Sequence, residues 1–222
     1  MGEATRKRVL EPVVVESTPS IIARKLRTAI ADGDLAPGAQ LTETGLAADL
    51  GVSRGPLREA MQRLTQEGLL VSYRNRGIFV TAMDDADIDD MYVARTAVER
   101  AALAAVVRRA DPADVAALRD AVAQMAVFVD EPDGTAIGNA DMGFHERLVE
   151  CAGSPRLSRF HETIIVETRM CLRAMGSSYT SAAERVDEHA AIVDAVAAGD
   201  LARADALLLA HMHDGRARLR RS

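Results

Sequence analysis

The chain has 222 residues, with 27 Lys and Arg against 33 Asp and Glu and a formal net charge of −6. Its length allows one or two domains with a sizeable core, and 48% hydrophobic and 27% charged residues exclude disorder as the main state. No apolar run approaches the roughly 20 residues that a membrane-spanning helix needs, so we expect no membrane partner. Two cysteines cannot form a disulfide framework, which favours a cytoplasmic location.

Charge is divided unevenly along the chain. Residues 1–82 carry 11 Lys and Arg and 9 Asp and Glu, a net of +2, whereas residues 83–222 carry 16 and 24, a net of −8. The acidic total argues against indiscriminate binding of nucleic acid. The mildly basic first third still permits contact with DNA through one face.

The first third predicts a helix, a helix-turn-helix and a hairpin. Residues 1–18 are polar with scattered valines and predict a flexible arm. Apolar spacing, capping residues and turn glycines then predict, in chain order, helices over 20–30, 43–50 and 54–67 and strands over 69–73 and 78–81. Thr42 and Ser53 are the expected N-caps of the second and third helices, and Gly51 ends the second.

The helix over 54–67 has the composition of a DNA-reading helix. Its apolar residues fall on one side, which leaves Arg54, Arg58 and Arg63 on the outer surface. Arginines near the start of such a helix can meet guanine edges in the major groove. The hairpin tip carries Arg74, Arg76 and Gly77, which suit phosphate or minor-groove contact. By spacing alone, a helix-turn-helix that never contacts DNA, with a merely solvated arginine face, is an equal alternative.

This segment resembles the N-terminal winged helix of GntR-family transcription regulators. The residues that carry the resemblance are Leu26–Ile30, Gly33, Leu35, Pro37-Gly38, Leu41-Thr-Glu43, Leu46-Ala47, Leu50-Gly-Val-Ser-Arg54, Pro56-Leu-Arg-Glu-Ala60, Leu64, Glu67-Gly68-Leu69 and Asn75-Arg-Gly77 with Val80. The resemblance implies a winged-helix domain over 19–82. In this domain, Arg54 and Arg58 match arginines that read or anchor DNA. Ser53 matches a residue whose hydroxyl contacts phosphate, and Gly77 matches the glycine at the wing tip. Thr44 stands where some members carry a DNA-contacting arginine.

After an acidic link, the chain predicts helices nearly to its end. Pro and Gly breaks divide it into expected helices over 85–109, 112–129, 135–152, 155–175, 180–198 and 201–220. Asp141 and His145 lie four residues apart, and therefore share a helix face. His189 and His211 fall on the apolar stripes of two later helices, whereas His213 lies off its stripe and is expected to be exposed; the sequence assigns His161 no place.

An Asp and three His on inward faces require partners, because unpaired buried polar groups are costly. A divalent metal would satisfy Asp141, His145, His189 and His211 together. Separate hydrogen-bonded core residues are an equal alternative at this point.

The same region resembles the FCD ligand-binding domain of FadR-like GntR regulators. The matching residues are Tyr92-x-x-Arg95, Val98-Glu99, Asp141-x-x-x-His145, Cys151-Ala-Gly-Ser-Pro-x-Leu157, Glu188-His189-x-x-Ile192, Ala195-Val-x-Ala-Gly-Asp200, Ala204 and Ala210-His211-Met212. The resemblance, over 84–220, implies an antiparallel all-α bundle, a homodimer, and metal ligation by Asp141, His145, His189 and His211. A Zn, Ni or Mn ion with open positions would accept a small carboxylic-acid effector. Arg95 matches the family's position for balancing such an anion. Arg169 and Arg173 are further candidates, although surface pairing is expected for Arg173.

The sequence therefore predicts a mainly α protein with an N-terminal winged helix-turn-helix and a C-terminal FCD-type bundle. Its expected function is that of a dimeric regulator, acting as a repressor on a palindromic DNA operator and responding to a carboxylate at a metal site. One alternative is an acyl-CoA-type or other sensor without metal. Another is a metal-dependent hydrolytic enzyme with Glu146 or Glu188 as base.

Overall fold

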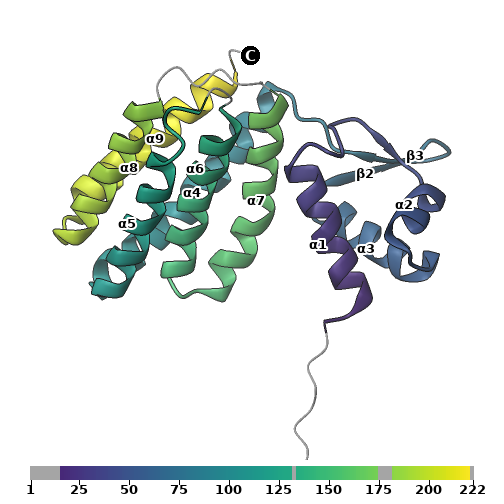
Figure 1. Cartoon of the computed structure of the whole chain (residues 1–222), viewed down its shortest axis with the longest axis horizontal. Helices are drawn as coiled ribbons and strands as arrows, with labels where there is room; N and C mark the ends of the chain where they lie inside the picture. The colour runs from purple at the N-terminus through teal and green to yellow at the C-terminus, as the bar shows by residue number, and fades with distance from the viewer. Residues whose placement is uncertain (1–15, 132–133, 175–181, 221–222) are drawn as a thin grey trace, which may run out of the picture.

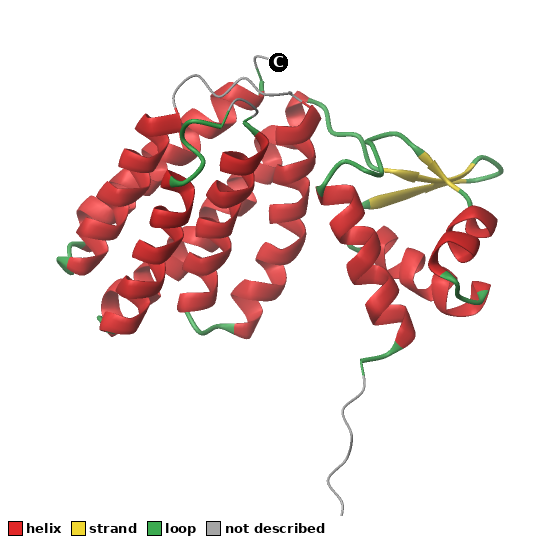
Figure 2. Ribbon diagram, in the orientation of Figure 1, coloured by secondary structure: helices red, strands yellow, loops and turns green. Residues whose placement is uncertain are grey.

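The architecture was analysed in a computed structural model, which describes residues 16–131, 134–174 and 182–220 (Figure 1). Most of the arm expected over 1–18 lies outside the described residues, and so do the first two residues of the helix expected over 180–198. Figure 2 shows a small N-terminal unit of helices and strands beside a bundle made of helices. None of the described helices is both long enough and apolar enough to cross a lipid bilayer.

The N-terminal unit contains three helices and a three-stranded antiparallel sheet. Its elements are α1 (Thr18–Ala31), β1 (Gln40–Leu41), α2 (Glu43–Leu50), α3 (Arg54–Gln66), β2 (Leu70–Tyr73) and β3 (Gly77–Val80). The strand order is β1-β3-β2, with Leu70 opposite Val80 and Leu41 opposite Ile78. The sequence analysis missed β1 because two residues are too few to show a period.

Local capping explains the sharp turn between α2 and α3. The Thr42 hydroxyl accepts a hydrogen bond from the Gly45 amide, and Gly51 ends α2 in the left-handed region at φ 65°. Both roles were predicted. Ser53 stands at the N-cap position of α3, as predicted, but its side chain makes no capping hydrogen bond. Its exposed hydroxyl is left available to another partner.

The bundle consists of α4 (Asp85–Arg109), α5 (Pro112–Ala126), α6 (Thr135–Cys151), α7 (Pro155–Ala174), α8 (Ala182–Ala197) and α9 (Leu201–Leu219). Among successive helices, α5 packs against α6, α6 against α7, and α8 against α9. The long α4 packs against α6, α7, α8 and α9. An Asp84–Asp87 capping box fixes its start.

Two apolar cores stabilise the molecule, and the second crosses the boundary between the units. The first lies inside the bundle. The second is centred on α1 and α3, but it also includes Met142 of α6 and Ile165, Val166 and Met170 of α7. Figure 1 shows α7 as the bundle helix that lies against α1. The N-terminal unit is therefore packed against the bundle.

Candidate metal centre and DNA-binding surface

Three helices bring four potential metal ligands to one point in the bundle. The i,i+4 spacing on α6 puts Asp141 and His145 on one face, α8 supplies His189, and α9 supplies His211. All four are buried, and one ligand atom from each lies within 4.8 Å of the others. The structure thus brings together the set that the sequence predicted.

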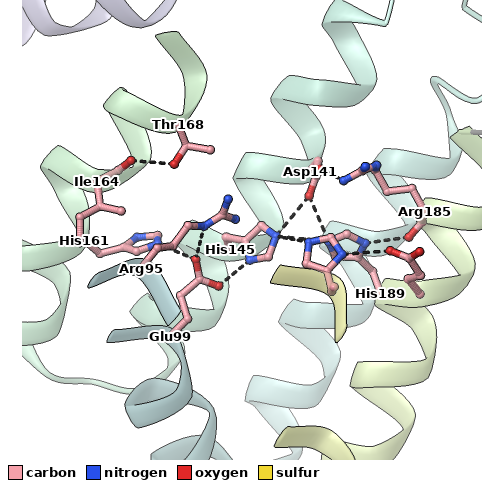
Figure 3. Close-up of polar contacts among 11 residues, drawn as sticks. Arg95, Glu99, Asp141, His145, His161, Ile164, Thr168, Arg185 and His189 are labelled. Carbon is pink, nitrogen blue, oxygen red and sulfur yellow. Dashed lines mark hydrogen bonds and ion pairs between the residues drawn. The ribbon is translucent and has the colours of Figure 1, made fainter. Parts of the chain in front are cut away.

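The distances between these atoms match the spacing of ligands around one ion. His145 Nε2 lies 3.1 Å from His211 Nε2 and 3.4 Å from His189 Nε2. Asp141 Oδ1 lies 3.2 Å from His145 Nε2 and 3.1 Å from His189 Nε2 (Figure 3). Ligands about 2.1 Å from a metal are about 3.0 Å apart in an octahedron and about 3.4 Å apart in a tetrahedron.

The opposite nitrogens of the imidazoles determine which atoms carry protons. His145 Nδ1 lies 2.5 Å from a Glu99 carboxylate oxygen, and His189 Nδ1 lies 2.7 Å from the Arg185 carbonyl oxygen. His211 Nδ1 lies 3.0 Å from a Glu188 carboxylate oxygen. Oxygen acceptors require a proton on Nδ1, so each neutral ring presents a lone pair at Nε2.

These three lone pairs converge on a carboxylate oxygen that also lacks a donor. Asp141 Oδ1 is buried and makes no hydrogen bond. Four buried acceptor atoms that face one another are costly unless a cation lies among them. The residues therefore fit a divalent ion, and this donor set of imidazole and carboxylate suits Zn, Ni or Mn.

The charge states of Asp141 and His211 are those that a metal needs. Burial raises the pKa of Asp141, but the Arg185 guanidinium and the facing imidazoles hold it well below its usual range. Burial and the neighbouring His189 lower the pKa of His211 to about 3. Asp141 is therefore a carboxylate and His211 a neutral imidazole at neutral pH.

Further charged residues surround this cluster, and of these Arg185 was not selected from the sequence. Arg185 Nη1 donates to Asp141 Oδ2 at 2.7 Å, and Arg95 Nε donates to Glu99 Oε1 at 2.7 Å. His161, which the sequence could not place, is buried and lies 3.1 Å from the same Glu99 oxygen. An i,i+4 spacing links Arg185 to His189 and Arg95 to Glu99, and this was the signal that could have found them.

The two arginines proposed for an effector lie in different surroundings. Arg95 is 1% exposed, stacks over the Tyr92 ring at 5.5 Å, and has a buried Nη2 with no hydrogen-bond partner. Arg169 Nη2 instead donates to Glu146 Oε2 at 2.9 Å at the edge of the bundle. Arg173 lies 4.0 Å from Asp32 near the surface, as expected. His213 is exposed, also as expected.

The arginines of α3 lie on its exposed face. Arg58 Nε donates to Glu43 Oε2 at 2.7 Å, and Arg54 Nη2 donates to Thr44 Oγ1 at 3.3 Å. Arg63 pairs with Glu67 at the end of the helix at 2.9 Å. The first two therefore lie at the N-terminal end of α3, where a recognition helix meets base edges.

The hairpin of β2 and β3 presents a basic tip. Arg74 and Arg76 are exposed, and Arg76 lies over the rings of Tyr73 and Phe79 at 5.5 and 6.0 Å. Gly77 adopts φ 101°, a conformation that side chains rarely adopt. The turn therefore holds the Arg76 guanidinium over two aromatic rings, next to a glycine that has no side chain to cover the backbone.

Comparisons with known proteins define the class of protein. Residues 20–80 match the family described as bacterial regulatory proteins of the gntR family, and residues 90–214 match the FCD domain. The chain belongs to the GntR family of transcriptional regulators and carries an FCD domain. This confirms the resemblance and the fold class that the sequence predicted.

Individual relatives agree with that class. An HTH-type transcriptional regulator from an unstable DNA locus of Streptomyces ambofaciens is 34% identical over 192 residues, which cover 85% of this chain and 79% of the relative. A "Probable D-xylose utilization operon transcriptional repressor" of Paenarthrobacter nicotinovorans is 31% identical, with 95% and 90% covered. A GntR regulator from Rhodococcus sp. RHA1 superposes with a TM-score of 0.79 at 32% identity, covering 92% of this chain and 98% of that one. These proteins are transcriptional regulators and not enzymes.

Proposed function

We propose that this regulator is a repressor whose binding to operator DNA is modulated by a small carboxylic acid at a divalent metal held by Asp141, His145, His189 and His211. The observation that carries the proposal is the convergence of three imidazole nitrogens and one carboxylate oxygen, all from buried residues, at one point in the bundle. When bound, the ion would supply a cationic docking point with positions left for an exogenous oxygen ligand.

Arg95 supports a carboxylate as the effector. Its Nη2 is buried without a partner, while its Nε is held by Glu99, the carboxylate that also fixes His145. A guanidinium anchored on one side can direct its remaining donors at an anion. Arg169 is a second effector contact in this proposal. To reach the effector, its side chain would have to break its hydrogen bond to Glu146.

The DNA-binding surface consists of Ser53, Arg54, Arg58, Arg63, Arg74, Arg76 and Gly77, all of them exposed. A homodimer would place two copies of α3 in successive major grooves of a palindromic operator, about one helical turn apart. The printed name of the Paenarthrobacter relative supports repression. Action on bacterial DNA implies a cytoplasmic location.

Thermal unfolding tests the centre and the effector together. We expect Zn²⁺, Ni²⁺ or Mn²⁺ to raise the melting temperature of chelator-treated protein, since a ligand at 100 times its dissociation constant stabilises the folded state by about 2.7 kcal/mol. Acetate, lactate, succinate and citrate are then screened with and without the ion. At least one acid should raise the melting temperature further, and only when the metal is present.

His189→Ala and His213→Ala form the matched pair for this experiment, because His189 is buried in the cluster and His213 is exposed on α9. His189→Ala should lose the metal shift and the acid shift, and His213→Ala should keep both. Full metal occupancy in the His189→Ala protein would contradict the site. If the metal raises the melting temperature but no acid raises it further, the ion is structural and these acids are excluded as effectors.

A further inference from the structure

A buried carboxylate connects the proposed metal centre to a second helix. Glu99 of α4 is fully buried and accepts from Arg95 Nε, faces His145 Nδ1 at 2.5 Å and faces His161 Nε2 at 3.1 Å (Figure 3). His145 belongs to α6, and His161 belongs to α7. One carboxylate is thus shared between a ligand helix and the helix that touches the DNA-binding unit.

The next residue of α7 is linked to the recognition helix through a residue of α1. Glu162 Oε1 lies 3.7 Å from Arg27 Nη1 on α1, and Arg27 Nη2 donates to Glu67 Oε2 at 2.7 Å. Glu67 is the C-cap of α3 and also pairs with Arg63. Arg27 is buried between these two carboxylates, so a displacement of α7 alters a contact at the end of α3.

Apolar packing connects the same elements. Met142 follows the ligand Asp141 on α6, yet its side chain belongs to the core of the DNA-binding unit. Ile165, Val166 and Met170 of α7 belong to that core as well. Packed cores respond to displacement by shifting between discrete arrangements, because they have few voids to absorb it.

We propose that Glu99 is a positioning residue that ties the metal centre to α7, and that α7 conveys occupancy of the centre to α3 through Glu162 and Arg27. The inference rests on the proposed metal centre. A cation on Nε2 of His145 polarises its Nδ1–H and strengthens the bond to Glu99. His145 faces Oε2 of this carboxylate and His161 faces Oε1. A stronger bond at Oε2 draws negative charge away from Oε1, so metal binding weakens the contact of Glu99 with His161 on α7. Coupling of this kind is reciprocal between metal and DNA.

Hydrogen exchange of the full chain, with Zn²⁺ as the probe or with chelator, tests the route. In the unmodified protein we expect Zn²⁺ to slow amide exchange around Arg27 and Glu67 by about fivefold or more, the lower range of typical couplings. Zn²⁺ affinity is measured separately by competition with a chromophoric chelator.

The matched variants are Glu162→Gln and Glu150→Gln. Both glutamates are exposed, but Glu162 faces the buried Arg27, whereas Glu150 pairs only with the exposed Arg147 among the described contacts. Glu162→Gln should bind Zn²⁺ within about twofold of the unmodified protein but lose at least half of the protection around Glu67. Glu150→Gln should keep both, since exposed pairs contribute little. Unchanged protection in Glu162→Gln would overturn the route while leaving the centre intact.

Glu99 is tested by Glu99→Gln and by the conservative Glu99→Asp. Loss of a residue that orients a ligand weakens metal binding about 10- to 100-fold, and we expect Glu99→Gln at saturating Zn²⁺ to abolish the protection change as well. Glu99→Asp should restore part of it, which a purely structural role would not. Failure of the unmodified protein to bind Zn²⁺ would overturn both the centre and the inference.

Discussion

Arg58 is already oriented in the free protein. Its side chain is 64% exposed, and its Nε is held by Glu43 of the preceding helix. A guanidinium fixed through Nε presents its two remaining nitrogens outward, which is the arrangement that bidentate contact with guanine needs. An exposed ion pair of this kind contributes little to folding. We therefore expect this ion pair to serve DNA recognition by orienting Arg58.

Arg58→Ala should weaken operator binding without unfolding the protein. One base-reading arginine contributes about 1–3 kcal/mol, or a roughly 5- to 150-fold rise in dissociation constant. Fluorescence anisotropy with a duplex selected from a random library, at fixed salt, measures it. The control is Arg147→Ala, which removes another exposed arginine, on α6. Equal effects of the two substitutions would remove Arg58 from the recognition surface.

Glu167 makes stability depend on pH at the contact between the two units. It is half-buried on α7, and a Cβ built at Gly68 would lie 3.9 Å from its Oε1. Burial, with Asp87 and Asp90 nearby, raises the pKa of Glu167 to about 7. The folded state therefore binds the proton of the Glu167 carboxyl group more tightly than the unfolded state does. The contribution of this group to the free energy of unfolding is complete below pH about 4 and is lost as pH rises through about 7.

Glu167→Gln should therefore raise the melting temperature more at pH 8 than at pH 5.5. After allowance for solvent screening the effect is about 1 kcal/mol, or about 2–4 °C for a chain of this size. Calorimetry of the variant against the unmodified protein at both values measures the difference. Glu162→Gln, whose carboxylate is exposed, should show no such change. A shift of the same size at both pH values would show that Glu167 does not titrate in this range.

At the scale of single elements, the hairpin depends on one glycine. Gly77 has φ 101°, and a Cβ there would lie 3.0 Å from Nε2 of Gln40, which donates to the Arg76 carbonyl. Gly77→Ala should cost about 1–3 kcal/mol of local strain and weaken DNA binding by displacing Arg76. Gly143→Ala in α6 meets open space and should stabilise by about 0.5–1 kcal/mol. Denaturant unfolding measures the free energy of unfolding of the two variants. A change of the same sign in both would contradict this expectation.

The helices were predictable because each carries its own period and its own end signals. The expected range 85–109 agrees with α4, whose capping box Asp84–Asp87 is local in sequence. Part of the proposed ligand set was predictable because Asp141 and His145 share one helix face. An i,i+4 spacing marks Arg185 and Glu99 as neighbours of His189 and Arg95, but their bonds to Asp141 and His145 could not be predicted, since each joins helices far apart in the chain. The same holds for the contact of His161 with Glu99. β1 depends on pairing with β3 and has too few residues to show a period.

At the scale of the whole molecule, the sequence predicted two domains but could not indicate how they pack. An acidic link separates them along the chain, yet consecutive residues of α7 belong to different cores. Ile164 packs in the bundle core, and Ile165 packs in the core of the DNA-binding unit. A helix with apolar residues on two faces is typical of an element covered on both sides. α7 is therefore part of the structure of both units.

This division predicts different effects for two adjacent substitutions. Ile165→Ala, although in the bundle, should destabilise the DNA-binding unit, because truncation of a buried isoleucine costs about 2–5 kcal/mol. Ile164→Ala should destabilise the bundle instead. Hydrogen exchange resolved by peptide distinguishes them: faster exchange in α1 and α3 is expected for the first, and in α4 and α9 for the second. If both variants loosen the two units equally, the chain unfolds as one cooperative block and the two cores are energetically a single one.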